Sequence, residues 1–142
     1  MPITTLIVDD TAETRDVLSM LVSQAGAQSI KTVPDGPTAL ALLEKEPVDL
    51  VFTDYQMPGM DGIALSRELR IRYPRMTLVM ITVLDDPELR HRALLAGVDM
   101  FLPKPITLTT LDTLIASLER IPHDVEDWNQ WLAQWVSPRQ EV

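Results

Sequence analysis

The sequence predicts an α/β fold in which five βα units build a doubly wound, parallel five-stranded sheet. Short apolar runs alternate along the chain with longer stretches of helical periodicity. Glycine and proline residues also stand where those helical stretches begin and end. Such alternation is typical of repeated βα units around a parallel sheet. An extra amphipathic helix is expected after the fifth unit.

The apolar runs are the expected strands. They lie at residues 4–8, 29–33, 50–53, 78–81 and 100–102. Each run is followed by a helical stretch, so consecutive strands are expected to be parallel.

Two helices are expected between the first three strands. The first carries apolar residues at i, i+3, i+4 and i+7, namely Leu18, Leu21, Val22 and Ala25. Gly26 follows it and tolerates the left-handed backbone of a helix end. The second helix has Pro37 in its first turn and ends before Pro47.

Three more helices follow. The third spans residues 62–73, and Pro74 closes it. Its apolar residues are Ile63, Leu65, Leu69 and Ile71. The fourth begins at Asp86 and Pro87 and stops at Gly97, and the fifth begins near Thr107. The apolar side of the fifth consists of Leu108, Leu111, Leu114, Ile115 and Leu118.

The segment after Pro122 predicts a sixth helix at residues 124–136, with an apolar stripe along one side. Three tryptophans lie on that stripe: Trp128, Trp131 and Trp135. A tryptophan can bury about 200 Å², so the stripe is expected to pack on the domain itself, on a second copy or on a downstream output domain. The expected organisation is one main domain at residues 1–121 and a helical extension at residues 122–142.

The composition excludes several classes of protein. The chain contains no cysteine, which rules out disulfides, thiolate metal sites and cysteine nucleophiles. Twelve basic and twenty-one acidic residues give a net charge of −9, so neither nucleic acid nor a membrane surface is an expected partner. No apolar run reaches the length of a membrane span, and the expected localisation is cytoplasmic.

Reactive groups gather where the expected strands end. Asp9 and Asp10 follow the first strand, Asp54 the third and Thr82 the fourth, while Lys104 lies in the loop after the fifth. An aspartate in such a place is, taken singly, more often a helix cap or turn residue. Adjacent strands lie about 4.8 Å apart, however, so carboxylates at their ends would meet and repel unless a cation joins them. Oxygen ligands with open positions for water and phosphate favour Mg²⁺.

The loop that presents Lys104 is stiffened by two prolines. Pro103 precedes the lysine and Pro105 follows it, and a residue before proline is held extended. The Lys104–Pro105 bond is a candidate for the cis isomer. A single lysine in a loop is usually solvated. Between these two prolines, a solvated side chain and an ammonium group directed at the site are about equally expected.

Four segments at these strand ends resemble the receiver domains of bacterial two-component response regulators. They are LIVDD ending at Asp10, DYQMPGMDG beginning at Asp54, MIT ending at Thr82 and FLPKP ending at Pro105. The resemblance covers residue 4 to about residue 120. It implies a flavodoxin-like topology, makes residues 1–121 a receiver domain, and implies a signalling phosphoacceptor rather than an enzyme.

The resemblance also implies how Mg²⁺ and the phosphoryl group are held. Asp54 would take the phosphoryl group from a phosphohistidine of a histidine kinase or a histidine phosphotransfer protein. Asp9, Asp10, Asp54 and the backbone carbonyl of Gln56 would bind Mg²⁺, with Asp10 the more direct ligand of the acidic pair.

Two further residues would bind the transferred group. Thr82 would donate a hydrogen bond to one phosphoryl oxygen and Lys104 would neutralise another.

Phe101 stands at the switch-aromatic position of the family. By resemblance, it would turn inward as Thr82 moves toward the phosphoryl group, which couples the site to the surface of the fourth helix, fifth strand and fifth helix. Its simpler interpretation is core packing. Val83 replaces the family's usual small residue and is expected to crowd the site against small phosphodonors. Leu84 cannot orient a water, so a longer-lived acyl phosphate is expected.

Two surface features add expectations about contacts. Val17 and Met20 lie beside the apolar stripe of the first helix, where receiver domains meet phosphodonors, and are expected to be partly exposed. Four arginines in and after the third helix are expected to form a solvated face that pairs with local carboxylates and has no assigned function: Arg67, Arg70, Arg72 and Arg75.

Three other classes of protein fit parts of this pattern. A haloacid-dehalogenase-type phosphatase needs Asp-x-Asp after the first strand, whereas Asp9 and Asp10 are adjacent. A flavin-binding module needs a Ser-, Thr- and Gly-rich phosphate loop there, and these carboxylates would repel phosphate. A degenerate receiver that acts only as an interaction platform is the remaining alternative, and the complete set of polar residues argues against it.

Overall fold

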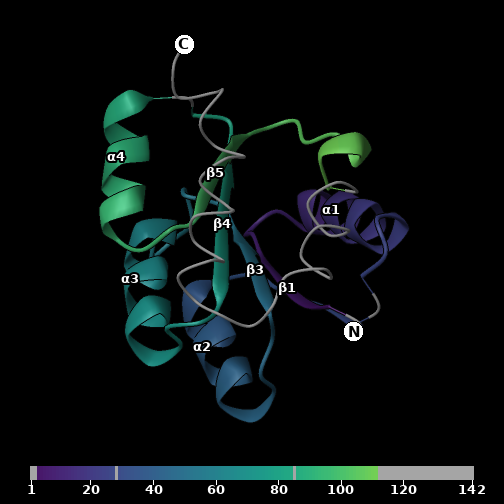
Figure 1. Ribbon diagram of the computed structural model, residues 1–142, viewed down its shortest axis with the longest axis horizontal. Helices are drawn as coiled ribbons and strands as arrows, with labels where there is room; N and C mark the ends of the chain where they lie inside the picture. Colours follow the sequence, from purple (N-terminus) through teal and green to yellow (C-terminus); the bar gives the residue numbers. More distant parts are fainter. Residues whose placement is uncertain (1–2, 28, 85, 112–142) are drawn as a thin grey trace.

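Five strands form one parallel sheet in the order β2-β1-β3-β4-β5 (Figure 1). The computed structural model describes residues 3–27, 29–84 and 86–111. The strands are β1 (Thr4–Val8), β2 (Ser29–Val33), β3 (Leu50–Thr53), β4 (Thr77–Thr82) and β5 (Met100–Pro103). The predicted doubly wound parallel sheet is confirmed, and the predicted strand limits differ from these by a single residue at most.

Helices cover both faces of the sheet. They are α1 (Ala12–Gln24), α2 (Gly36–Lys45), α3 (Gly62–Arg72) and α4 (Pro87–Leu95). Helix α1 lies on one face, while α2, α3 and α4 lie on the other (Figure 1). Residues 108–111 are helical, so the fifth helix begins where the sequence predicted. The rest of that helix, the predicted helix at residues 124–136 and the extension at residues 122–142 lie outside the described residues.

The helix boundaries follow from capping residues. The carboxylates of Asp35 and Asp61 accept hydrogen bonds from the backbone N–H groups of Thr38 and Ala64, each at 2.8 Å, at the starts of α2 and α3. Asp86 caps α4 in the same way, bonding the N–H of Glu88 at 3.1 Å. These bonds satisfy N–H groups that a helix leaves unpaired in its first turn.

The core has a layer on each side of the sheet. One cluster packs β1, β3, β4 and β5 against α1, with Leu18 and Val22 facing the sheet. A second lies between α2, α3 and the sheet, and a third joins the start of α3 to α4 and includes Phe101. The strands are therefore packed against helices on both faces of the sheet.

Helix α3 buries one side, and one expectation about this helix is wrong. Ile71 is 73% exposed, because it lies about 200° around the helix from the buried Leu69. Arg70 is not a solvated surface residue. It pairs with Asp99 at 2.7 Å and donates to the backbone carbonyls of Gly97, Pro74 and Met76.

The topology places a crevice between two particular strands. The chain passes from β1 to β2 on one side and then crosses to β3 on the other, so the winding direction reverses between β1 and β3. Ligands of open α/β sheets bind outside the carboxyl ends of the strands at such a point. None of the helices in residues 3–27, 29–84 and 86–111 is long and apolar enough to cross a membrane.

Candidate functional site

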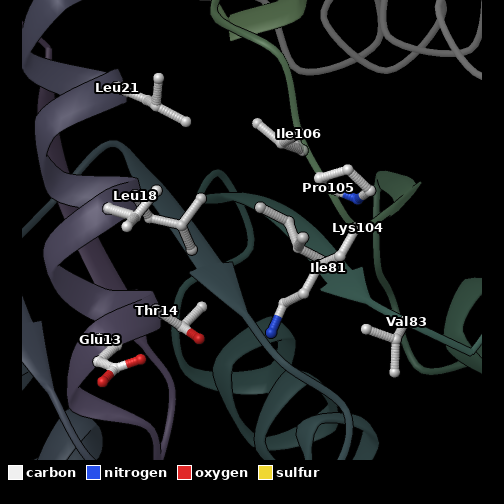
Figure 2. A pocket seen from close by; sticks show the side chains of 10 residues that line it. Glu13, Thr14, Leu18, Leu21, Ile81, Val83, Lys104, Pro105 and Ile106 are labelled. Atoms are coloured by element: carbon white, nitrogen blue, oxygen red, sulfur yellow. The ribbon is translucent and has the colours of Figure 1, made fainter.

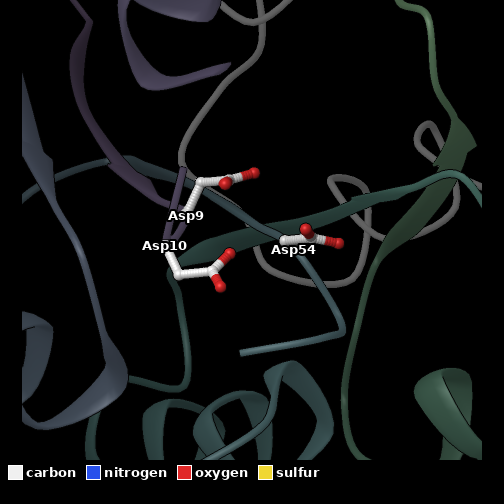
Figure 3. A group of neighbouring side chains, drawn as sticks. All are labelled: Asp9, Asp10 and Asp54. Atoms are coloured by element: carbon white, nitrogen blue, oxygen red, sulfur yellow. The ribbon is translucent and has the colours of Figure 1, made fainter. Parts of the chain in front are cut away.

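Three carboxylates meet at the crevice between β1 and β3. Asp9 and Asp10 follow β1, Asp54 follows β3, and the backbone N–H of Asp54 donates to the carbonyl of Val8 at 3.1 Å. Oxygen atoms from the three side chains all lie within 4.8 Å of one another. Figure 3 shows the carboxylates projecting into one region. The structure thus brings together the three acidic residues that the sequence singled out.

The two adjacent aspartates have different surroundings. Asp9 is 1% exposed, and its Oδ1 accepts the N–H of Thr11 at 2.9 Å while its Oδ2 accepts Lys104 Nζ at 3.0 Å. Its backbone carbonyl accepts Arg15 Nη1 at 2.7 Å. Asp10 is exposed, so its carboxylate is open to a ligand that arrives from solvent.

Asp54 lies deeper than Asp10. Its Oδ1 accepts the N–H of Tyr55 at 2.7 Å, and its Oδ2 faces Lys104 Nζ at 3.3 Å. Burial raises the pKa of Asp54; Lys104 opposes this shift, and the neighbouring Asp9 carboxylate adds to it. Ionisation of the Asp54 carboxyl is therefore less favourable than it would be in water.

Lys104 joins the carboxylates from the β5 side. Burial disfavours its charged form, but the hydrogen bond to Asp9 and the charges of Asp54 and Asp9 outweigh that effect, so the pKa of Lys104 is raised. Its backbone N–H donates to the carbonyl of Thr82 at 2.8 Å, which ties the loop to the end of β4. The Lys104–Pro105 peptide bond is cis, as the sequence suggested.

Thr82 is the last residue of β4 and lies at the same edge of the sheet as the three carboxylates. It is 1% exposed, and its Oγ1 accepts the N–H of Leu84 at 3.3 Å. The next residue, Val83, is 68% exposed, and together with Lys104 it lines an apolar groove. Gln56 is exposed in the loop after Asp54. That its backbone carbonyl binds Mg²⁺ remains a prediction.

Gly62, predicted only as the start of the third helix, is also a residue of the site. A Cβ at this position would lie 2.1 Å from the carbonyl oxygen of Asp54, so the helix start approaches the backbone of Asp54 as only glycine allows. The same carbonyl accepts the hydroxyl of Thr53 at 2.9 Å. The available signal in the sequence was a glycine directly after the helix cap Asp61.

Phe101 is buried, with 2% of its surface exposed. It packs in the cluster that joins the start of α3 to α4, together with Ile63, Met80 and Leu89. Tyr55, which follows Asp54, packs against this cluster. The burial of Phe101 is what its simpler interpretation, core packing, predicts. Its role as a switch stays a prediction.

An apolar groove of about 430 Å³ opens beside Lys104. Leu18 and Leu21 of α1 form one wall, and Ile81, Pro105 and Ile106 form the other. Figure 2 shows the ammonium of Lys104 pointing from the second wall toward the first. Nearby on α1, Val17 and Met20 are 54% and 59% exposed, as expected from the sequence.

The donor set suits a hard divalent cation. Three carboxylates offer one oxygen each within a small volume, which is the ligand chemistry that Mg²⁺ prefers, and the exposure of Asp10 leaves room for water in the remaining positions. Sulfur and imidazole ligands are not part of the cluster.

The comparison with protein families agrees with this geometry. The family model of the response regulator receiver domain matches residues 5–116. The chain belongs to this family. Receiver domains are signalling phosphoacceptors of two-component systems, they generally bind Mg²⁺ at an acidic pocket, and they interact with histidine kinases and output domains.

Individual relatives come from several kinds of signalling protein. Chemotaxis protein CheY-3 of Vibrio cholerae is 37% identical over 108 residues, which cover 75% of this chain and 83% of that protein. Sensor histidine kinase RcsC of Salmonella typhimurium is 37% identical over 117 residues, which are 82% of this chain and 12% of the kinase.

Solved structures share the fold. CheY4 of Vibrio cholerae superposes with a TM-score of 0.74 at 28% identity, covering 86% of this chain and 100% of that one. The BeF3-activated DrrB receiver domain gives a TM-score of 0.76 at 26% identity, with 84% and 100% covered. The flavodoxin-like topology is thereby established.

Proposed function

We propose that this receiver accepts a phosphoryl group on Asp54 from a phosphohistidine of a histidine kinase or a histidine phosphotransfer protein, in a reaction that requires Mg²⁺. The observation that carries the proposal is the convergence of Asp9, Asp10 and Asp54 within 4.8 Å, with Lys104 bonded to two of them. The half-buried ammonium of Lys104 supplies a positive charge next to the proposed acceptor, where a phosphoryl oxygen would arrive.

The proposed reaction is a displacement at phosphorus. A carboxylate oxygen of Asp54 bonds to phosphorus as the phosphorus–nitrogen bond of the donor breaks, and the imidazole leaves with a proton from solvent. The ammonium of Lys104 then faces a phosphoryl oxygen, and the Thr82 hydroxyl donates to another. The chain contributes positioning and charge neutralisation, which are the main terms in phosphoryl transfer.

Asp9, Asp10, Asp54 and the carbonyl of Gln56 would hold the metal ion. When bound, Mg²⁺ would neutralise the carboxylates and a phosphoryl oxygen, so that an anion is able to approach. Because Asp9 is 1% exposed and both of its oxygens already accept hydrogen bonds, the exposed Asp10 is the more accessible direct ligand of the acidic pair. Asp9 would act in part through water.

We further propose that Phe101 and the extension at residues 122–142 carry the signal outward. Phosphoryl binding would draw Thr82 toward Asp54 and favour the buried orientation of Phe101, which changes the surface of α4, β5 and the helix that begins at residue 108. Trp128, Trp131 and Trp135 would dock a second copy or an output domain. Tryptophan emission and sedimentation with Mg²⁺ and beryllofluoride test this, and no change in either would assign the extension a structural role.

Intact-mass measurement after incubation with a phosphorylated histidine donor tests the central proposal. One added phosphoryl group is expected on the native chain, and none on Asp54→Asn or in EDTA. An equal yield from Asp54→Asn would disprove the assignment of the acceptor. An unmodified native chain would instead favour the degenerate-receiver alternative, in which the domain acts only by binding other proteins.

A further inference from the structure

The side chain of Arg90 stacks on the ring of Phe101. The guanidinium carbon lies 5.7 Å from the ring centroid, within the range of a cation–π interaction. Arg90 is half-buried on α4, and Phe101 belongs to β5, so the contact joins a helix to the strand that leads into Lys104. It is therefore a polar contact at the edge of an otherwise apolar cluster.

Phe101 is connected to Asp54 through described contacts. Tyr55 donates its N–H to Asp54 Oδ1 at 2.7 Å, and the Tyr55 side chain packs against the cluster that contains Phe101. Ile63, also in that cluster, directly follows Gly62, which lies against the Asp54 carbonyl. A displacement of Asp54 would therefore alter the packing around Phe101 through both Tyr55 and Ile63.

A second connection runs through the sheet. Met80 of β4 is paired with Phe101, and the carbonyl of Thr82 accepts the N–H of Lys104 at 2.8 Å. A displacement of Thr82 would therefore alter the strand pair that carries the ring. The cation–π contact with Arg90 depends on the ring staying in its buried orientation, because an outward rotation would carry it away from the guanidinium.

We infer that Arg90 is a positioning residue that holds Phe101 in the buried orientation and thereby strengthens phosphoryl binding at Asp54. The inference rests on the proposed function, in which phosphoryl binding favours that orientation. A contact made in only one of two states shifts the equilibrium toward that state, and by linkage raises affinity for the ligand that prefers it. Arg90 would do so without touching the phosphoryl group.

Beryllofluoride, which stands in for the phosphoryl group, gives a direct test by calorimetric titration in saturating Mg²⁺. Arg90→Met keeps much of the side-chain length and removes the charge, and it is expected to weaken beryllofluoride binding about two- to five-fold, the size of an ordinary cation–π contribution. Arg90→Lys keeps a cation and should retain part of the affinity. Arg92→Met, on the exposed part of the same helix, is the matched control and should bind as the native chain does.

Two further measurements separate this role from a merely structural one. Arg90→Met should leave the affinity for Mg²⁺ alone unchanged, and it should add no weakening in a Phe101→Leu background, where the ring is already gone. Native beryllofluoride affinity in Arg90→Met, or the same weakening in both backgrounds, would overturn the inference. Failure of the native chain to bind beryllofluoride would instead overturn the proposed function, and with it this inference.

Discussion

The ammonium group of Lys104 donates to Oδ2 of Asp54 at 3.3 Å while it also donates to Oδ2 of Asp9 at 3.0 Å. One cation therefore already contacts two of the three carboxylates that a metal ion would share. The raised pKa of Lys104 means that this cation is charged when the site meets either a metal ion or an anion. Lysine and metal thus compete for the same oxygens, and the phosphoryl group offers the lysine a new partner.

Lys104→Met is expected to bind Mg²⁺ more tightly, by about three- to ten-fold, because a competing positive charge is removed from a partly buried site. The same change should slow phosphorylation of Asp54 by on the order of 100-fold, since one phosphoryl oxygen loses its neutralising partner. Calorimetric Mg²⁺ titration and intact-mass kinetics with acetyl phosphate measure the two effects. Lys31→Met is the control, because Lys31 forms an exposed ion pair with Glu46. Weaker Mg²⁺ binding in Lys104→Met would contradict competition between the lysine and the metal ion.

Gly62→Ala is expected to destabilise the fold by about 3 kcal/mol, because the new methyl group would lie 2.1 Å from the Asp54 carbonyl oxygen and force α3 away from the site. Gly59→Ala is the matched control. Gly59 has a φ of +79° with open space around it, so its change should cost only about 1 kcal/mol of backbone strain. Urea unfolding of both variants gives the comparison, and equal losses would show that the close approach carries no special cost.

Val83→Ala is expected to label several-fold faster with acetyl phosphate, because the branched side chain lines the groove that Lys104 also lines and would narrow the approach to Asp54. Val17→Ala, which lines the same groove from α1, should leave the labelling rate unchanged. Intact-mass time courses compare the variants. Since Val83 is 68% exposed, an unchanged rate in Val83→Ala would mean that its side chain faces solvent without obstructing the site.

Much of the fold and of the site could be predicted because the relevant signals are local. Pro37 stands in the first turn of α2, Gly97 ends α4 with a positive φ, and Asp9, Asp10 and Asp54 stand at strand ends. Carboxylates at the ends of parallel strands meet once those strands are neighbours. The strand order itself needed the family resemblance, because alternation of strands and helices fits several orders.

The missed features depend on contacts between residues distant in sequence. Arg70 bonds the carbonyl of Gly97 and the carboxylate of Asp99, partners 27 and 29 residues away, and nothing near Arg70 in the sequence marks them. Gly62 is required by a backbone carbonyl, a group that every residue carries.

Arg70→Lys is expected to destabilise the fold by about 2 to 3 kcal/mol, because a lysine cannot reproduce the guanidinium bonds to three backbone carbonyls and to Asp99. Arg67→Lys, at an exposed position of the same helix, should change stability by less than about 0.5 kcal/mol. Urea unfolding measures both. A loss in Arg70→Lys no larger than that of the control would show that these bonds contribute little beyond solvation.

Asp99 gives the last prediction, on the pH dependence of stability. Burial raises the pKa of Asp99 above its ordinary value of 3.8, and the Arg70 guanidinium only partly opposes this shift. The folded state then binds the proton more tightly than the unfolded chain does. The resulting contribution to stability is complete below the unfolded pKa and is lost as pH rises through the folded pKa.

Asp99→Asn keeps an oxygen that accepts the Leu78 N–H and removes the titration. The free-energy difference between the native chain and Asp99→Asn should therefore shrink as pH rises from about 4 toward neutrality, measured by urea unfolding at each pH. Asp49→Asn, whose carboxylate accepts exposed hydrogen bonds from Thr4, controls for general loss of charge. A difference that grows with pH would show that the ion pair with Arg70 outweighs burial at Asp99.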